Sequence, residues 1–321
     1  MEFASVRIYL VVFAISVACQ GVATTPFLNK LEKQNIQNIV NNSLDPAKET
    51  DFKVQKRPSK ELHRTKQTLS YELKTKYAVD KVVGGTLAQE GQFPWMAVIH
   101  QLLGAGRISM CGGTIISIRW ILTAGHCIAN GPTNFNVILG IVDKSGIGYD
   151  YNEGAGLSMY TTQGALHPQY GMGVNDIALL YLPQDIPFNE KIQPIRLAGQ
   201  AKAQQTFEGS TAYVFGWGLD GTGYTENQKH LKYGALPIIS NAQCMQFWSI
   251  NDGNICTAPS TGSDACQGDS GGPLIVWEQN QPLQIGIVSF GDTDCPSRRP
   301  GVFTKVAAFS NWIAQVTGIQ Y

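Results

Sequence analysis

The chain has 321 residues, of which 34 are glycine, 15% are charged and 43% are hydrophobic. This length allows one large or two modest domains with a substantial core, and the composition excludes collagen, coiled coils and wholesale disorder. Its 24 basic and 24 acidic residues cancel to a formal charge of zero. The total charge therefore gives no reason to expect a nucleic-acid partner. There are seven cysteines, an odd number.

Residues 1–20 have the features of a secretory signal. A start containing Arg7 precedes the apolar run Ile8–Ala18, and small residues follow it. The run is about a dozen residues long, whereas a helix that spans a bilayer needs about 20, which argues against a membrane anchor. We therefore predict a secreted, extracellular protein that does not associate with membranes. Cys19 lies in or beside this segment, and the point of signal cleavage is left open.

Residues 21–81 differ in composition from the rest of the chain. They carry twelve Lys or Arg and seven Asp or Glu, a net charge of +5, and they contain no cysteine or tryptophan. Low hydrophobicity combined with a net positive charge predicts a loosely ordered segment. Asn41 begins an Asn-Asn-Ser sequon and is a candidate glycosylation site. Residues 82–321 carry eleven basic and sixteen acidic residues, so the neutral total conceals an acidic main domain.

From Val82 onward, short runs rich in Val, Ile and aromatic residues are separated by turn residues, which predicts an all-β sandwich or a pair of barrels. The predicted strands are Gly113–Ile118, Trp120–Ala124, Phe135–Leu139, Ile177–Leu182, Tyr213–Phe215, Leu274–Trp277, Ile285–Phe290 and Val302–Val306. Only the C-terminus shows a helical pattern. Apolar residues recur at i, i+3 and i+4 from Val306 to Val316, and Gly318 is placed to end the helix.

Three short motifs carry residues suited to nucleophilic catalysis. Leu122–Cys127 (LTAGHC) ends a predicted strand, and Asn175–Leu180 (NDIALL) places an acid before an apolar strand. The third motif is Asp264–Pro273 (DACQGDSGGP). On these motifs, which follow the order His, Asp, Ser, residues 82–321 resemble the chymotrypsin/trypsin-like serine endopeptidases along their whole length.

A serine hydroxyl is a weak nucleophile at neutral pH and needs an adjacent base. Histidine titrates near neutrality, and a carboxylate on its other ring nitrogen can orient it. The resemblance implies that Ser270 is the nucleophile, His126 the general base and acid, and Asp176 the orienting carboxylate. It also places the oxyanion hole at the backbone N–H groups of Gly268 and Ser270. The remaining histidines lie outside the motifs and are read as surface or core residues: His63, His100, His167 and His230.

No metal or other cofactor is expected. His126 and Cys127 are adjacent, but the C-x₂₋₄-C and H-x₃₋₅-H spacings of zinc sites are absent. A calcium loop in the region 143–153 is left open, because its ligands cannot be aligned.

The resemblance also implies a substrate pocket for the P1 residue, with Asp264 at its base. A carboxylate at the base of a narrow pocket selects Arg or Lys. Gly291 and Gly301 match the positions that form the open walls of this pocket. Ala265 stands where many relatives have serine, and the missing hydroxyl predicts a preference for Arg over Lys.

Two departures from the family pattern affect the neighbouring subsites. Phe290 replaces a tryptophan beside the pocket, and Asp292 and Asp294 add acidic charge at its rim. The preference for the residues P2–P4 is therefore left open.

The segment Lys81–Gly85 (KVVGG) matches the activation junction of the family. The resemblance implies that cleavage after Lys81 frees the α-amino group of Val82, which then pairs with Asp269 and completes the oxyanion hole. Residues 21–81 are thus predicted to be an activation propeptide. Because it has no cysteine, it is neither a disulfide-knotted clip module nor held covalently after the cut. The activator is left open between self-cleavage and another trypsin-like protease.

Six cysteines follow residue 100, and sequence alone allows fifteen pairings of six. The resemblance selects Cys111–Cys127, Cys244–Cys256 and Cys266–Cys295, and leaves Cys19 over. It implies two packed antiparallel β-barrels, about residues 82–200 and 201–305, followed by a helix at about 306–317. The catalytic residues would lie in the cleft between the barrels. Expected partners are protein or peptide substrates, an activating protease and protein inhibitors, and the enzyme is expected to be a monomer.

Two functions of other classes fit parts of the sequence. A catalytically silent homologue would act as a secreted binding cofactor, but the intact triad His126, Asp176 and Ser270 favours an enzyme. An extracellular β-sandwich adhesion module would leave the three motifs unexplained. The physiological substrate and pathway, whether digestion, venom, clotting or defence, are left open.

Overall fold

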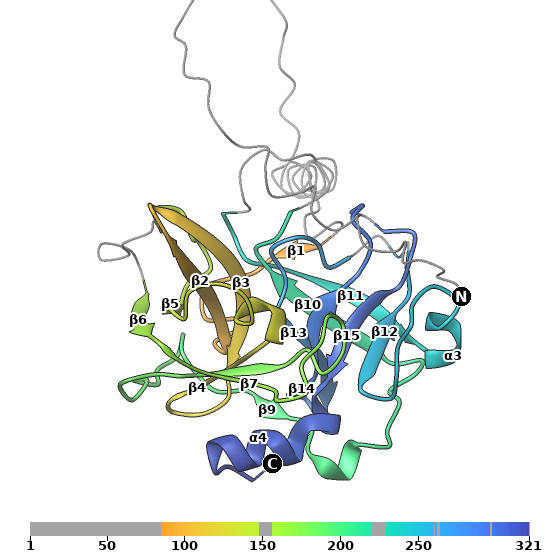
Figure 1. Cartoon of the computed structure of the whole chain (residues 1–321). Coiled ribbons are helices and arrows are strands. Elements are labelled where there is room, and N and C mark those ends of the chain that lie inside the picture. The colour runs from red at the N-terminus through yellow and green to blue at the C-terminus, as the bar shows by residue number, and fades with distance from the viewer. Residues whose placement is uncertain are drawn as a thin grey trace, which may run out of the picture. The chain divides into compact units, whose positions relative to one another are not determined.

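The computed structural model describes residues 85–147, 156–219, 229–259, 261, 264–295 and 297–320. The predicted signal, the propeptide with Asn41, and the junction residues Lys81 and Val82 lie outside these ranges. The described chain is mostly β-structure, arranged as two curled sheets with apolar interiors (Figure 1). None of its helices has the length and apolar character needed to cross a bilayer.

The first sheet has seven strands in the order β6-β5-β2-β3-β4-β8-β7. Their bounds are β2 Met96–Gly104, β3 Arg107–Ile115, β4 Trp120–Thr123, β5 Phe135–Leu139, β6 Leu157–Thr161, β7 Gln163–Leu166 and β8 Ala178–Tyr181. Every pair in this sheet is antiparallel. The outermost strands, β6 and β7, follow one another along the chain, so the chain itself joins the two edges of the curled sheet.

The second sheet has the order β1-β11-β10-β13-β14-β15-β12. Its strands are β1 Thr86–Leu87, β9 Arg196–Leu197, β10 Thr211–Gly216, β11 Lys232–Ile239, β12 Asn254–Thr257, β13 Pro273–Glu278, β14 Gln281–Phe290 and β15 Gly301–Lys305. Strand β11 pairs with both β10 and β12, which closes the sheet into a barrel. The short β1 pairs with β11, and β9 pairs in parallel with β14.

The predicted fold class, two packed antiparallel barrels and a C-terminal helix, is confirmed. The first barrel is shorter at both ends than the predicted range of about residues 82–200. Strands β1 and β9 lie within residues 82–200, but they pair with strands of the second sheet. Each predicted strand overlaps an observed one, whereas β1, β2, β6, β7, β9, β11 and β12 were not predicted.

The C-terminal helix differs from the prediction in its first turn. Val306–Phe309 forms the 3₁₀ turn η3, and the α-helix α4 covers Ser310–Thr317. Gly318 ends it in the left-handed region with φ 74°. The helix α3, Asn241–Cys244, contradicts the expectation that only the C-terminus is helical, and its signal is a capping box in which Ser240 and Gln243 bond reciprocally. Two further 3₁₀ turns are η1 Gly125–Cys127 and η2 Gln200–Lys202.

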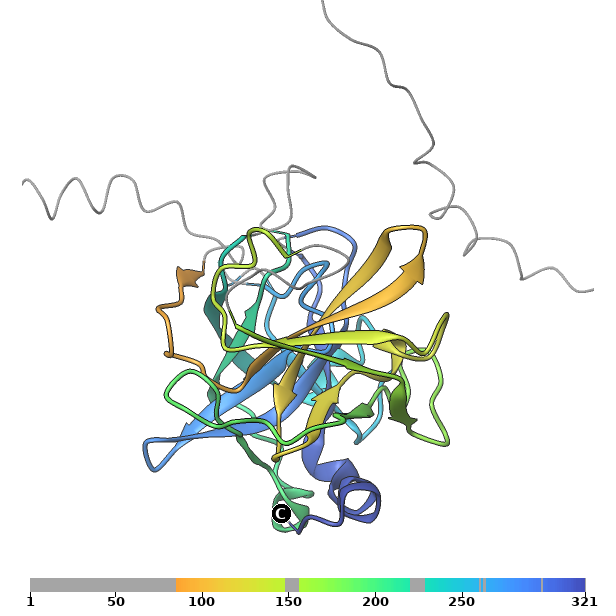
Figure 2. The ribbon, with the colours of Figure 1, turned by 90° about the vertical axis from the view of Figure 1, so that its left-hand side faces the viewer.

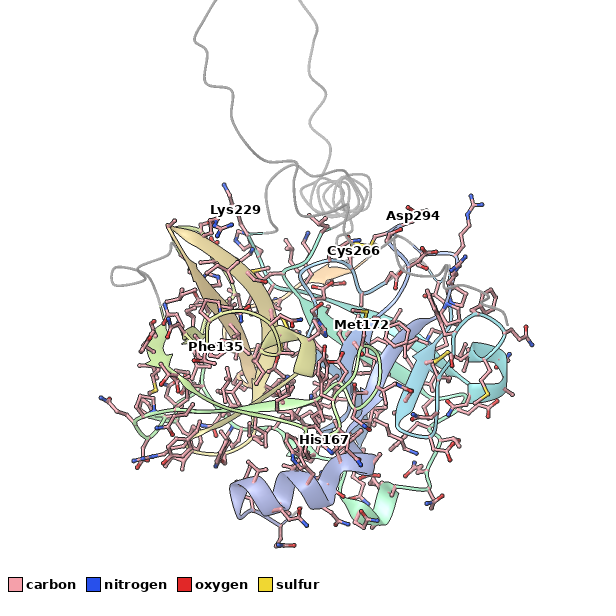
Figure 3. All side chains as sticks on the ribbon, in the orientation of Figure 1. Phe135, His167, Met172, Lys229, Cys266 and Asp294 are labelled. Atoms are coloured by element: carbon pink, nitrogen blue, oxygen red, sulfur yellow. A yellow bond between two sulfur atoms is a disulfide. The ribbon has the colours of Figure 1, made fainter. Side chains whose placement is uncertain are left out.

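Helix α4 contributes to the core of the first barrel. Ile313 is fully buried there, as is Val306 of the preceding turn η3, and Phe309 of that turn is buried as well. Each such side chain contributes about 1.5–3 kcal/mol through burial. The ring of His167, which follows β7, packs edge-on against Phe309 at 5.2 Å between ring centroids. Figure 2 shows the first sheet from its outer side with α4 beyond its edge, and Figure 3 labels His167 beside the helix. The helix thus joins the end of the second barrel to the first.

Three disulfides are present, and they have the pairing that the resemblance implied. Cys111–Cys127 ties β3 to η1, and Cys244–Cys256 ties α3 to β12. Cys266–Cys295 joins two loops of the second barrel. Disulfides of this kind persist in oxidising compartments.

Candidate active site

His126 and Asp176 are brought together by the pairing of β4 with β8. His126 lies in η1, directly after β4, and Asp176 lies just before β8, whose Ala178 is paired with Thr123. The Nδ1 atom of His126 is 2.8 Å from Oδ2 of Asp176, and the His126 backbone N–H donates to Oδ1 at 2.8 Å. The carboxylate therefore holds both the ring and the backbone of this histidine. Within the described ranges, these bonds use Nδ1 of the ring and leave its Nε2 edge for a reaction partner.

Asp176 is held in turn by two residues of the second barrel that the motifs did not predict. The Ser289 hydroxyl donates to Asp176 Oδ2 at 2.5 Å, and the Thr304 hydroxyl donates to the Asp176 backbone carbonyl at 2.7 Å. Burial acts to raise the pKa of Asp176, but the bonds from His126 and Ser289 hold it below its ordinary value. The carboxylate consequently stays ionised at neutral pH and can stabilise an imidazolium.

Ser270 lies on a loop of the second barrel that contacts the first barrel through backbone atoms. The N–H of Gly112 on β3 donates to the Ser270 carbonyl at 2.7 Å. At the next residue, Gly271, φ is +78°, and a Cβ would collide with Thr123 Oγ1 and the Gly112 carbonyl. Only glycine fits this close approach, so the Gly-Gly pair after the serine allows the two barrels to meet at the motif.

The residues just before Ser270 form a turn suited to an oxyanion hole. Gly268 has φ +98°, and a Cβ on it would lie 3.0 Å from the Cα of Gly218. The Asp269 carboxylate is buried and accepts hydrogen bonds from the N–H groups of Gly218 at 2.7 Å and Cys266 at 2.9 Å. Burial raises the pKa of Asp269 to about 6. A buried carboxylate of this kind is well suited to receive a cation.

Ser270 and Asp264 line one cavity of about 120 Å³ in the second barrel. Asp264 is 8% exposed, and its Oδ2 accepts the N–H of Ser297 at 2.7 Å. Burial raises the pKa of Asp264, the charge of Asp292 acts in the same direction, and the N–H groups of Ser297 and Ala265 act against them. The cavity is therefore lined by both a buried carboxylate and the Ser270 residue, which suits a cationic side chain.

The walls of this cavity are made by the residues named from the sequence. A Cβ built on Gly291 would lie 4.0 Å from the Cα of Gly301, so the two glycines face each other. Ala265 and Phe290 also line the cavity, and Phe290 packs edge-on against Trp248 at 5.6 Å between ring centroids.

Of the two acidic residues that the sequence suggested for the rim of the cavity, only one lines it. Asp292 lines the cavity, but its Oδ2 lies 3.7 Å from Nε of Arg299, so part of its charge is compensated. Asp294 is exposed and is not among the lining residues (Figure 3).

The donor atoms of Cys111, His126 and Cys127 lie within 4.8 Å of one another. Both sulfurs belong to one disulfide and Nδ1 of the ring is bonded to Asp176, so this group does not have the chemistry of a metal site. Asp143, at the start of the calcium loop left open above, bonds to Ser145 and lies 3.3 Å from His230, while residues 148–155 are outside the described ranges.

Comparison with known proteins agrees with this geometry. The family model described as trypsin matches residues 82–313. Trypsin 5G1 of Aedes aegypti is 30% identical over 246 residues, 74% of this chain and 86% of that protein. Serine protease SP24D of Anopheles gambiae is 33% identical and covers 73% of this chain and 80% of its own. A solved structure of HL collagenase has a TM-score of 0.64 and 33% identity, and covers 74% of this chain and 99% of its own. The chain therefore belongs to the trypsin family of serine proteases.

Proposed function

We propose that this protein is a secreted serine endopeptidase that cleaves after Arg in preference to Lys. The observation that carries the proposal is the cavity shared by Ser270 and Asp264, together with the His126–Asp176 pair. A nucleophile, an oriented base and a buried anion for the P1 side chain are the parts that such a reaction requires.

The proposed reaction proceeds through an acyl-enzyme. Ser270 Oγ attacks the carbonyl carbon of the scissile bond as its proton moves to Nε2 of His126. The N–H groups of Gly268 and Ser270 stabilise the oxyanion that forms. The imidazolium, stabilised by Asp176, gives its proton to the leaving amine, and the C–N bond breaks. Water then attacks the ester by the same steps and regenerates the serine.

The preference for Arg rests on the surroundings of Asp264. Its carboxylate already accepts bonds from the N–H groups of Ser297 and Ala265, which leaves fewer of its lone pairs for the P1 cation. Ala265 provides no hydroxyl to help solvate a compact ammonium. The planar guanidinium has five donors and reaches additional acceptors, so it loses less than Lys in this pocket.

Substrate profiling of the activated protein, combined with sequencing of its new N-terminus, tests these assignments together. Matched peptides with Arg or Lys at P1 are expected to show a higher kcat/KM for Arg. An equal or higher value for Lys would refute the preference while leaving the endopeptidase assignment in place.

We also propose that the chain is made as an inactive precursor. The signal at residues 1–20 and the three disulfides support secretion. Cleavage after Lys81 frees the Val82 ammonium, which pairs with the buried Asp269 and fixes the Gly268 N–H toward the substrate. An upstream trypsin-like protease or the enzyme itself performs this cut, because Lys81 is a basic P1 residue.

The substitution Lys81→Gln is expected to give a secreted, folded chain that is not processed. Without the ammonium partner for Asp269 the oxyanion hole is incomplete, and losing one oxyanion donor costs about 10²–10³ in kcat. Gel mobility, N-terminal sequencing and hydrolysis of a P1-Arg ester measure the effect. Lys76→Gln, a change at another lysine of the same segment, serves as the control and should be cut after Lys81 as usual. Full activity of the uncut Lys81→Gln chain would exclude this activation mechanism.

Binding of a P1 cation is expected to weaken as the pH falls. The midpoint of this transition should lie at a higher pH than the ordinary pKa of an aspartate. The reason is that only ionised Asp264 attracts the cation, and its pKa is raised by burial and by Asp292. The inhibition constant of benzamidine, measured by displacement of a fluorescent probe across pH 4–8, reports this site without requiring turnover. Asp292→Asn should move the transition to lower pH. A transition at the same pH in both proteins would contradict the assigned role of Asp292.

A further inference from the structure

A second cavity lies on the other side of the oxyanion loop from the P1 pocket. Its volume is about 600 Å³, and Gln267 lines both cavities, so this residue separates them. Gly268 lines only the second cavity, and Ser270 and Asp264 line only the first. The other side chains at the second cavity come from the end of the β2–β3 hairpin and from the segments around Lys144 and Lys229; Figure 3 labels Lys229 at this end of the hairpin.

In the proposed reaction, the part of the substrate that follows the scissile bond passes this second cavity. The P1 side chain enters the first cavity, and the scissile carbonyl points to the N–H groups of Gly268 and Ser270. The chain that follows the scissile bond must then continue away from the first cavity, past Gly268. The second cavity therefore faces the side chains of the leaving group, P1′ and P2′.

The second cavity places a half-buried ammonium close to that path. Nζ of Lys144 lies 3.3 Å from Sδ of Met110, a weak acceptor. Met110 in turn contacts the oxyanion turn: its Cε is 3.2 Å from the position that a Cβ on Gly268 would take. One methionine side chain thus links the ammonium to the residue that binds the oxyanion.

The described residues around Lys144 offer its ammonium little opposite charge. Among the described residues that line the cavity there is no Asp or Glu, whereas both Lys144 and Lys229 are present. Burial lowers the pKa of Lys144 to about 8, and the carboxylate that opposes this shift is Asp269, which is buried below the oxyanion turn and already accepts two backbone bonds. At neutral pH the ammonium is still mostly protonated, and a carboxylate entering the cavity would restore interactions that burial has removed.

We propose that Lys144 is a specificity-determining residue that selects an acidic side chain at P1′ or P2′ of the substrate. This inference rests on the proposed endopeptidase function and extends it to the leaving-group side. The enzyme then recognises a dipolar sequence, with a cation before the scissile bond held by Asp264 and an anion after it held by Lys144. Each charge meets its complement in a partly desolvated cavity, where pairing is stronger than at the open surface.

The test uses the full chain after activation and internally quenched peptides with Arg fixed at P1. Glu and its neutral isostere Gln are compared at P1′ and separately at P2′. The kcat/KM of the Glu peptide is expected to exceed that of the Gln peptide by about fivefold to thirtyfold at one of these positions, the range between exposed and desolvated charge pairs. Raising the salt concentration from about 0.05 M to about 0.5 M should reduce this ratio.

The variant Lys144→Met removes the charge but keeps an unbranched apolar chain beside Met110, and it should bring the Glu/Gln ratio to within about twofold of one. The matched control is Lys191→Met, because Lys191 is an exposed lysine that pairs with Glu90 away from both cavities; its ratio should equal that of the wild type. Both peptides are measured in the same preparation, so a lower yield of folded variant cancels from the ratio.

The possible outcomes separate this inference from the function on which it rests. If the wild-type enzyme cleaves the Gln peptides after Arg but gains nothing from Glu at either position, the role of Lys144 is overturned and the endopeptidase assignment stands. If the Glu advantage survives in Lys144→Met, another group provides it and the inference is equally wrong. If chains processed to Val82 cleave none of the P1-Arg peptides, the proposed function and this inference fail together.

Discussion

Replacing Ser270 with alanine is expected to lower kcat by about 10⁵–10⁶, which would leave only the rate enhancement that binding and the oxyanion hole provide. In the proposed mechanism, the hydroxyl oxygen of Ser270 forms the bond of the acyl-enzyme, and alanine has no atom in its place. His126→Ala should cost nearly as much, and the double variant little more than either single one. Residues that act as one unit in a mechanism are strongly non-additive.

The Ser270→Ala protein is expected to keep its fold, because the contacts that fix this loop use backbone atoms. The Gly112 N–H donates to the Ser270 carbonyl, and the Gly271 N–H donates to the Val288 carbonyl; neither needs the hydroxyl. A melting curve within about 2 °C of the wild type would confirm this, since a surface-sized change of 0.5 kcal/mol corresponds to roughly that shift.

A fluorophosphonate that labels active serines measures the effect directly. The activated wild type should be labelled, and Ser270→Ala should not. Ser158→Ala is the matched control, because the Ser158 hydroxyl bonds to Asn136 in the first sheet, outside the site; this variant should be labelled and active. An activated wild type that resists labelling would instead favour the catalytically silent homologue.

The second large effect is expected for Asp264→Ser, which should lower kcat/KM for P1-Arg substrates by about 30-fold to 4,000-fold. Truncating one partner of a buried, hydrogen-bonded charge pair costs about 2–5 kcal/mol, and each 1.4 kcal/mol is a factor of ten. The guanidinium would then enter the cavity without its counter-charge. Substrates with an apolar P1 residue should gain relative to Arg, because the cavity keeps its open glycine walls.

Stability is expected to rise slightly in Asp264→Ser, since burial of this carboxylate is unfavourable in the free enzyme, as its raised pKa indicates. A serine hydroxyl can still accept the Ser297 N–H. Asp294→Ser provides the control at a nearby exposed acid that does not line the cavity. The ratio of kcat/KM for P1-Arg substrates to that for apolar P1 substrates should match the wild type in this variant. If Asp264→Ser retained most of its activity on Arg, the base of the P1 pocket would have to be reassigned.

The strands predicted from the sequence are those in which apolar, β-branched and aromatic residues dominate a short run. The strands that were not predicted contain residues that break such a run. Strand β11 contains Gly234 and Pro237, both of which weaken a strand prediction, yet its burial alternates regularly and Pro237 pairs with Thr211. Strand β2 carries His100 and Gln101 in a buried stretch, where polar residues break the apolar run. Tertiary packing overrides local preference at these positions.

The residues of the candidate site divide in the same way. His126, Asp176, Ser270 and Asp264 lie in compact motifs, since each must sit at a strand end or a sharp turn with a defined set of neighbours. Ser289 lies 113 residues from Asp176 and in no motif, and it reaches the carboxylate only because β14 of one barrel meets the segment just before β8 of the other. Lys144 also lies in no motif, and its neighbours along the chain give no indication of a site.

By itself, then, the sequence determined the family, the disulfide pairing implied by it, the candidate triad and the anionic base of the first pocket. These features depend on residue identity at fixed spacing, which a linear chain records. The tertiary structure decided which side chains support Asp176, that Arg299 compensates the acidic rim, and that a half-buried lysine stands beside the oxyanion turn. Those features depend on the meeting of distant segments in a partly desolvated space, and there the strength of a charge is set by burial and by its neighbours in three dimensions.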